Sequence, residues 1–366
     1  MSYLFTSESV SEGHPDKVAD AISDAVLDLM MREGNKAYRC ACETLVTTNQ
    51  VILAGEYKGI YNHLEVENAV RRVIRDIGYE QDGFHWETVD IKNLMHGQSA
   101  DIALGTDTFG AGDQGLMFGY AINETPDLMP SAIYYSHKIV KILTAVRKSG
   151  AVWLGPDAKS QVTMEYNDDG SVRRIAKVVC STQHSADISI EDVREQVKTI
   201  ISTVLPDDLI DDNTEYLINP TGRFVIGGPD GDTGLTGRKI IVDTYGGYSP
   251  HGGGAFSGKD PTKVDRSAAY MARYIAKNIV ASGRASKATV QLSYAIGVKE
   301  PTSLFIKTEH GVEAGDTQWI LDNVDLTPAG IINRFELFRP IYSETTNYGH
   351  FGKPNLPWEA VDLFKD

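Results

Sequence analysis

The sequence predicts an α+β fold made of three structurally related βα repeat domains. Three times along the chain, a helix is followed by a strand, a turn and a second strand, and each unit continues into another helix. Recurrence of one element order is typical of internal repeats. A chain of 366 residues also exceeds what one hydrophobic core usually serves. We therefore expect three sheets, each with helices on one face, which could pack about a pseudo-threefold axis.

The first unit follows a short strand-like N-terminal segment. Pro15 suits a first helical position, apolar residues recur at helical spacing after it, and Gly34 ends the run. Segments rich in β-formers then predict strands over residues 38–47 and 50–57. Apolar spacing predicts a second helix over residues 64–77.

The second and third units repeat this order with different residues. The second is predicted to contain helix 132–148, strand 161–166, a turn at 167–170, strand 172–181 and helix 190–204. The third is predicted to contain helix 266–281, strand 288–296, a turn at 300–301, strand 303–308 and a helix near 318–338 that breaks at Pro328. We expect an N-terminal domain over residues 1–99, a central domain over 110–225 and a C-terminal domain over 226–366.

Residues 95–115 lose any sustained period and hold five glycines. This composition favours a flexible surface loop that covers a site, and we place a flexible active-site loop at residues 97–109. A plain linker between domains is the alternative.

Composition excludes several classes of partner. The net charge of −15 argues against nucleic acid and membrane surfaces, because both are anionic. Cys40, Cys42 and Cys180 have neither metal-ligand spacing nor an even disulfide set, which favours buried reduced thiols. The N-terminus lacks signal-peptide features and no apolar stretch approaches membrane-spanning length, so we expect a cytoplasmic protein.

Residues 252–266, GGGAFSGKDPTKVDR, combine three glycines with Lys259, Lys263 and Arg266. Exposed amides and cations suit an anion, and the carboxylates Asp260 and Asp265 suit a metal carried with it. A nucleotide triphosphate with magnesium satisfies both. The pattern G-x-x-x-x-G-K at residues 253–259 is not a convincing P-loop, because Asp260 stands where Ser or Thr should hold magnesium. A structural glycine turn remains the plain alternative.

A second dense segment, residues 219–239, adds glycine clusters with Arg223, Arg238 and Lys239, and Phe224 offers a face on which a base could stack. Each candidate also has an ordinary structural interpretation. Phe224 alone could be core, Asp232 a turn former and Lys159 a surface cation. His14, Asp16 and Asp265 alone could serve only the starts of helices.

Together the motifs resemble a known family. Residues 13–17 (GHPDK), 110–115 (GAGDQG), 157–159 (DAK), 222–224 (GRF), 234–239 (GLTGRK) and 252–260 (GGGAFSGKD) are similar, in order, to those of bacterial S-adenosylmethionine synthetase, also called methionine adenosyltransferase. The resemblance implies that methionine sulfur displaces triphosphate from C5′ of ATP, and that the triphosphate is then hydrolysed to pyrophosphate and phosphate. The sulfur loses no proton, so the absence of a catalytic triad motif agrees with this chemistry.

The resemblance also implies residue roles. His14, Lys159, Arg238 and Lys259 would be catalytic. The nucleotide would be bound by His14, Asp157, Lys159, Arg223, Phe224, Asp232, Arg238, Lys239, Ala255 and Lys259. Methionine would meet Glu56, Gln98, Asp113, Asp232 and Lys263. Asp16 and Asp265 would bind Mg²⁺, two ions per site, and Glu43 would bind K⁺.

The implied partners are ATP and L-methionine, in a homodimer with shared active sites that pairs into a homotetramer. The fold implied is three βα repeats about a pseudo-threefold axis. The loop between Gln98 and Gly110 is shorter than in bacterial relatives, which bears on lid closure. The rival interpretations are a non-catalytic nucleotide-binding scaffold, which should lack a cation or magnesium ligand, and a P-loop kinase.

Overall fold

Three four-stranded sheets carry the part of the chain that the computed structural model describes, residues 2–98 and 110–364. The N-terminal sheet has the order β11 (Gly234–Leu235), β2 (Arg39–Thr47), β3 (Gln50–Lys58) and β6 (Asp90–Gly97). The central sheet has the order β1 (Tyr3–Val10), β8 (Leu154–Tyr166), β9 (Val172–His184) and β10 (Glu215–Ile218). The C-terminal sheet has the order β14 (Gly311–Val312), β13 (Ser303–Thr308), β12 (Lys287–Tyr294) and β7 (Gly115–Ile122). A small ribbon pairs β4 (Glu80–Gln81) with β5 (Phe84–His85).

Helices cover one side of each sheet. The N-terminal sheet carries α1 (Pro15–Met31) and α2 (His63–Ile77), and the central sheet carries α4 (Ser131–Lys148) and α5 (Ile190–Ser202). The C-terminal sheet carries α7 (Val264–Ala281), α8 (Ala314–Asn323) and α9 (Pro328–Phe335). Short helical segments are α6 (Ile240–Asp243), η1 (Asp207–Leu209), η2 (Gly228–Asp230) and η3 (Pro357–Glu359). The predicted α+β fold of three related units is therefore confirmed.

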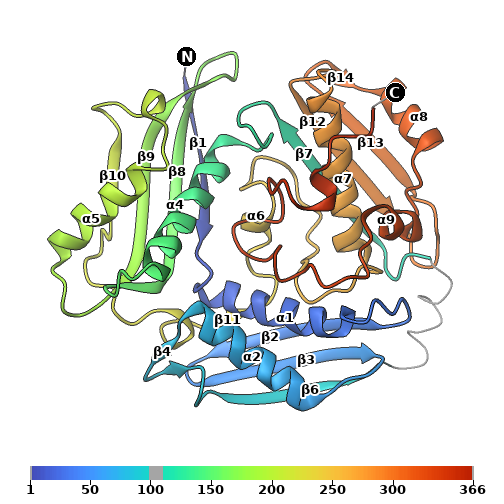
Figure 1. Ribbon diagram of the computed structural model, residues 1–366. Coiled ribbons are helices and arrows are strands. Elements are labelled where there is room, and N and C mark those ends of the chain that lie inside the picture. The colour runs from blue at the N-terminus through green and yellow to red at the C-terminus, as the bar shows by residue number, and fades with distance from the viewer. Residues whose placement is uncertain (1, 99–109, 365–366) are drawn as a thin grey trace.

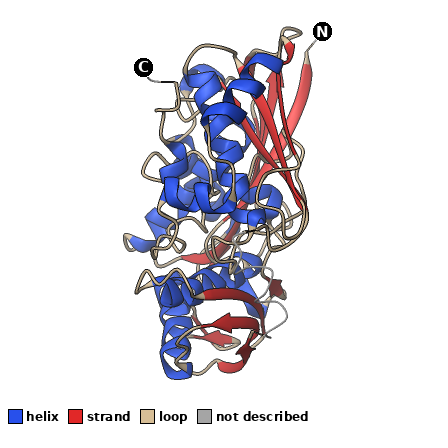
Figure 2. Cartoon of the chain, turned by 90° about the vertical axis from the view of Figure 1, so that its right-hand side faces the viewer, coloured by secondary structure: helices blue, strands red, loops and turns tan. Residues whose placement is uncertain are grey.

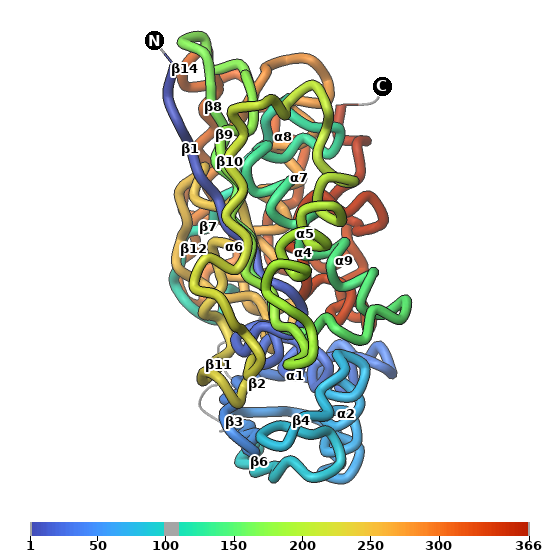
Figure 3. Tube along the Cα trace, turned by 90° about the vertical axis from the view of Figure 1, so that its left-hand side faces the viewer, coloured from blue at the N-terminus to red at the C-terminus, as the bar shows by residue number. Residues whose placement is uncertain are grey.

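The three units surround a common centre that contains α6 (Figure 1). Viewed from the side, the helices gather mostly toward one face of the molecule and the strands toward the other (Figures 2 and 3). Each unit has its own buried apolar cluster. Within the described ranges, no helix combines the length and apolar composition needed to cross a membrane.

Each sheet also takes one strand from a distant segment of the chain. Strand β1 pairs antiparallel with β8 of the central sheet, and β11 pairs with β2 of the N-terminal sheet. Strand β7, which precedes α4 in sequence, pairs with β12 of the C-terminal sheet. The sheets therefore do not follow the contiguous segments 1–99, 110–225 and 226–366, because strand pairing joins backbone groups regardless of separation along the chain.

The structure corrects some predicted elements. The strand predicted from residue 161 begins at Leu154, and its early part contains Pro156 where the pairing with β9 is irregular. A proline without an N–H is tolerated at such an irregularity. Strands β6 and β10 were not predicted, and β6 continues to Gly97, inside the segment expected to be a loop. The expected active-site loop at 97–109 lies mainly outside the described residues. The break predicted at Pro328 is confirmed, since α9 begins there.

Candidate functional site

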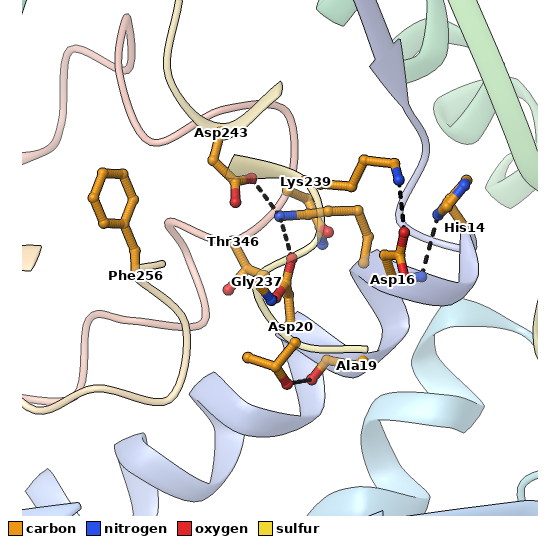
Figure 4. Close-up of polar contacts among 12 residues, drawn as sticks. His14, Asp16, Ala19, Asp20, Gly237, Lys239, Asp243, Phe256 and Thr346 are labelled. Atoms are coloured by element: carbon orange, nitrogen blue, oxygen red, sulfur yellow. Dashed lines mark hydrogen bonds and ion pairs between the residues drawn. The ribbon is translucent and has the colours of Figure 1, made fainter. Parts of the chain in front are cut away.

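The N-terminal turn of α1 brings together several residues predicted for ATP and magnesium. The Nζ atom of Lys239 lies 2.6 Å from Asp16 Oδ2, and Arg238 Nε lies 3.8 Å from Asp16 Oδ1. Asp16 Oδ1 also accepts a hydrogen bond from the backbone N–H of Leu235 at 2.9 Å. Figure 4 shows Asp16 and Lys239 meeting beside His14 at the start of the helix. This cluster, here called the α1 cluster, holds two cations against one carboxylate.

His14 caps α1 and is electrically neutral. Its Nδ1 accepts a hydrogen bond from the N–H of Asp16 at 3.2 Å. Burial, together with the positive charge of Lys239, lowers the pKa of His14 to about 3. A neutral imidazole whose Nδ1 accepts must carry its proton on Nε2. His14 can therefore cap the helix and also bind a ligand, because its Nε2–H remains as a donor.

Asp157 and Lys159 lie close to the α1 cluster. Both are on β8, where Lys159 pairs with Val10 of β1, and the charge of Lys159 acts on both His14 and Asp157. Asp157 Oδ2 accepts from Gly228 N at 2.8 Å, while its buried Oδ1 has no partner among the described residues. Burial raises the pKa of Asp157 to about 6. Asp157 therefore has one carboxylate oxygen open to a donor.

Arg223, Phe224 and Asp232 lie in the loop that leads from β10 to β11. The backbone N–H of Phe224 donates to His184 Nε2 at 3.0 Å, and the ring is half-buried. Arg223 and Asp232 are exposed. No hydrogen bond or ion pair in the described chain joins these side chains to His14 or Asp16, so their assignment to the nucleotide stays a prediction.

Residues 252–266 form a second group, here called the α7 cluster. Lys259 Nζ lies 2.5 Å from Asp265 Oδ2 at the start of α7, and Lys263 pairs with the buried Asp260. Gly252 and Gly254 serve close packing here, whereas Gly253 serves a left-handed backbone conformation. A Cβ on Gly252 would lie 1.7 Å from the carbonyl oxygen of Leu116, and Gly253 has a φ of +96°.

Arg266 is not part of an anion-binding surface, contrary to the prediction. Its side chain is 0% exposed and lies 2.7 Å from Asp24 of α1. It also donates to the carbonyl oxygens of Phe256 and Lys259. Burial against a carboxylate explains the difference, since the sequence gives no sign that Asp24 faces this cation. Arg266 thus joins the helices of two units.

The residues predicted for methionine and K⁺ are spread along nearby edges. Glu56 on β3 is half-buried, and its Oε1 lies 3.8 Å from His96 Nε2. The N–H of Gln98 donates to Tyr57 O, while its buried Oε1 has no partner among the described residues. Glu43 and Asp113 are exposed.

The two clusters lie on segments that approach one another. An isolated bridge pairs Ala41 of β2 with Lys259, and a Cβ on Gly237 would lie 2.6 Å from the Cβ of Ala255. Within residues 2–98 and 110–364, no hydrogen bond or ion pair links His14, Asp16 or Lys239 to Lys259 or Asp265. Nor does that part of the chain gather three or more His, Cys, Asp or Glu residues as a metal site.

Sequence reasoning missed a buried charged group directly behind the α1 cluster. Lys17 Nζ lies 3.2 Å from Asp20 Oδ2 and 2.6 Å from Asp243 Oδ1. The available signal was the placement of Lys17 and Asp20 three residues apart on a helix, which sets them on one face. Their partner on α6 is visible only in the tertiary structure.

Comparison with known proteins identifies the family. The three domain models of S-adenosylmethionine synthetase match residues 2–100 (N-terminal), 108–224 (central) and 226–360 (C-terminal). The chain is 56% identical over 389 residues to the S-adenosylmethionine synthase of Rhodopseudomonas palustris strain HaA2 and to S-adenosylmethionine synthase 2 of strain BisB18. It is 56% identical over 378 residues to the S-adenosylmethionine synthase of Rhodospirillum centenum. Each match covers 99% of this chain and 97% of the relative. The chain therefore belongs to the S-adenosylmethionine synthetase family.

Proposed function

We propose that this protein joins methionine to C5′ of ATP with loss of intact triphosphate, and then hydrolyses the triphosphate to pyrophosphate and phosphate. Membership of the family makes it a methionine adenosyltransferase, an enzyme of S-adenosylmethionine synthesis. The observation that carries the mechanism is the pairing of cations with single carboxylates in two clusters, Lys239 with Asp16 and Lys259 with Asp265. Such lysines can turn toward a polyphosphate while the carboxylates take a metal ion.

The first step moves charge but no proton from the nucleophile. The thioether sulfur forms a bond to C5′ as the bond from C5′ to the bridging oxygen breaks, and the electron pair stays with triphosphate. The neutral His14 is suited to this oxygen, because its Nε2–H is a donor that carries no net charge. Lys159, Arg238, Lys239 and Lys259 would stabilise the charge that develops on the leaving group.

Open acceptors support the binding assignments. Asp157 Oδ1 and Gln98 Oε1 are buried without partners among the described residues, so each can accept a hydrogen bond from a ligand. We assign Gln98 to methionine. We assign Asp157 to the nucleotide, together with Arg223, Phe224, Asp232 and Ala255. The remaining methionine contacts would be Glu56, Asp113 and Lys263, whose charges suit the ammonium and the carboxylate of the amino acid.

The donor set fits magnesium. Asp16 and Asp265 offer hard carboxylate oxygens, and Mg²⁺ commonly takes one or two carboxylates together with substrate phosphates. An ion bound in this way would neutralise charge on the polyphosphate. Two such ions per site would use one aspartate each, and the exposed Glu43 would hold K⁺.

The working unit is proposed to be a homodimer with shared active sites, paired into a homotetramer. Two observations support self-association. Within the described chain, no hydrogen bond or ion pair joins Asp16 or Lys239 to Lys259 or Asp265, so a second copy could complete each set. The sheets also expose large apolar side chains, including Leu94 on β6, Leu116 on β7 and Phe305 on β13, which a second copy could cover. A cytoplasmic location is proposed from three free, buried cysteines.

The direct test incubates the protein with ATP, methionine, Mg²⁺ and K⁺. S-Adenosylmethionine is followed by mass spectrometry, and pyrophosphate and phosphate are measured separately. Release of all three products in equal amounts is expected, with free triphosphate absent from the mixture. Nucleotide binding without product would instead favour a non-catalytic scaffold, and transfer of the γ-phosphate to an acceptor would favour a kinase. Omission of Mg²⁺ should abolish both steps.

A further inference from the structure

We propose that Lys17, Asp20 and Asp243 are positioning residues that fix Arg238 and Lys239 for triphosphate. This inference rests on the proposed function, because it concerns the cations assigned to the polyphosphate. None of the three side chains reaches the surface: Lys17 is 1% exposed, Asp20 0% and Asp243 3%. They therefore act through the segment that they hold and do not meet the ligand.

The network ties residues 237–243 at both ends. On one side of the two cations, Asp20 Oδ1 accepts from the N–H of Gly237 at 2.8 Å. On the other side, Asp243 ends α6 and accepts from Lys17 at 2.6 Å. The ammonium of Lys17 also donates to Asp20 Oδ2 at 3.2 Å, so one cation holds both carboxylates. Figure 4 labels Asp20, Asp243 and Gly237.

Backbone geometry explains why such ties are needed. Gly237 has a φ of +78°, in the left-handed region, and a Cβ there would lie 2.6 Å from Ala255 Cβ. The following α6 spans only four residues and has no side-chain cap at its start. Glycine adopts this conformation without strain but does not prefer it, and a helix this short has little local reason to keep its shape. Its conformation must be imposed by contacts from elsewhere.

The chemistry of the network also favours a role in positioning. Burying three charged groups costs solvation energy, and apolar side chains of similar volume often stabilise a fold as well or better. Apolar side chains cannot, however, accept the N–H of Gly237 or fix the end of α6 at one place. Misplacement of a catalytic cation by even 1 Å can lower a rate about 100-fold. The network thus costs solvation energy, but it gives Arg238 and Lys239 a defined orientation.

The test compares two substitutions of Asp243 with a matched pair elsewhere. Asp243→Asn keeps an oxygen that can accept from Lys17, whereas Asp243→Ala removes it. Glu359 is the control, because it too is a buried carboxylate that accepts from a lysine (Lys277 Nζ, 2.7 Å) and from a glycine N–H (Gly352, 2.9 Å). It lies on η3, which packs against α7, and it also pairs there with Arg273. The control variants are Glu359→Gln and Glu359→Ala.

The readouts are kcat, KM for methionine, hydrolysis of added tripolyphosphate, calorimetric affinity for tripolyphosphate with Mg²⁺, and thermal unfolding. For Asp243→Ala we expect kcat and tripolyphosphate hydrolysis to fall about 10- to 100-fold, with KM for methionine unchanged. Asp243→Asn should retain most of the kcat. Both Glu359 variants should unfold earlier but keep their kcat at temperatures where they are folded. If Asp243→Ala does not fold, Lys17→Met/Asp243→Asn removes the same tie without leaving an unpaired ammonium.

Lys239→Met separates this inference from the proposed function. Loss of activity in Lys239→Met with wild-type kcat in Asp243→Ala would overturn the positioning role and leave the function standing. Equal losses in the Asp243 and Glu359 variants, in proportion to their loss of stability, would also overturn it, because a merely structural network predicts that result. Full activity in Lys239→Met would remove the segment from catalysis and the positioning role with it.

Discussion

Removal of the Arg266 side chain should be among the most damaging single changes to stability in this protein. The guanidinium is 0% exposed and lies 2.7 Å from Asp24 Oδ1, which is also 0% exposed. A second bond joins Nη2 to Asp24 Oδ2 at 3.1 Å, and Nε donates to Tyr270 Oη at 2.9 Å. The same group stacks over Tyr342, with its central carbon 4.3 Å from the ring centroid. Arg266 thereby links α7 to α1 and to the C-terminal segment.

The substitution Arg266→Met keeps much of the side-chain volume and leaves Asp24 buried without its counter-charge. Breaking a buried ion pair by removing one partner typically costs about 3–5 kcal/mol, because the remaining charge is uncompensated. Asp24 would keep the N–H of Gly258 and the hydroxyl of Thr346 as donors. We therefore expect a loss of about 3–5 kcal/mol in the free energy of unfolding.

The assay is urea-induced unfolding at 25 °C, followed by tryptophan fluorescence and by circular dichroism. Two probes are needed because the chain has three apolar cores, which need not unfold together. The matched control is Arg174→Met, which breaks a two-bond pair with the exposed Asp211 and should cost far less. The double variant Arg266→Met/Asp24→Asn should recover part of the loss. A loss for Arg266→Met no larger than for Arg174→Met, or no recovery in the double variant, would refute the reasoning.

Three further outcomes are expected. Lys239→Met and Lys259→Ala should each lower kcat about 100- to 1000-fold while circular dichroism is unchanged, because each removes a cation that we assign to the leaving group. Wild-type turnover would contradict this assignment. Burial lowers the pKa of His137 to about 3. This pKa lies below that of the unfolded chain, so the unfolded state binds the proton first as the pH drops. The free energy of unfolding should therefore fall below about pH 6.5, by up to about 1.4 kcal/mol per pH unit. Urea titrations at several pH values should show a shallower dependence for His137→Asn, and an identical slope would count against the assignment. Gly252→Ala should lower the unfolding midpoint more than Gly253→Ala, because only the former Cβ would collide with a backbone oxygen, at 1.7 Å; the reverse order would be inconsistent with the packing described.

Local patterns along the chain were sufficient to predict most of the helices. Pro15 and the apolar spacing after it predict α1, and Pro328 marks the start of α9, because helix starts depend on nearby residues. The motifs around His14, Lys239 and Lys259 were likewise sufficient for the family, which the comparisons confirm. The residue roles remain predictions.

The expected active-site loop could not be compared with the structure. Most of residues 97–109 lie outside the described ranges, so its role stays a prediction. The alignment of 389 residues with the Rhodopseudomonas palustris relative is longer than this chain of 366, so that relative carries residues with no counterpart here. The prediction that some of them belong to the segment between Gln98 and Gly110 also remains open to test by alignment.

The amino-acid sequence by itself determined the fold class, most of the helices and the family, since these depend on spacing and on side-chain chemistry. Only the tertiary structure decided which charges face one another. Arg266 and Lys239 are both cations in glycine-rich stretches, yet the first is buried against Asp24, whereas the second stays partly accessible and pairs with the buried Asp16. Likewise, β1, β7 and β11 join sheets far from their own segments. The physical reason is that ion pairing and strand pairing depend on distance in space, which local sequence does not encode.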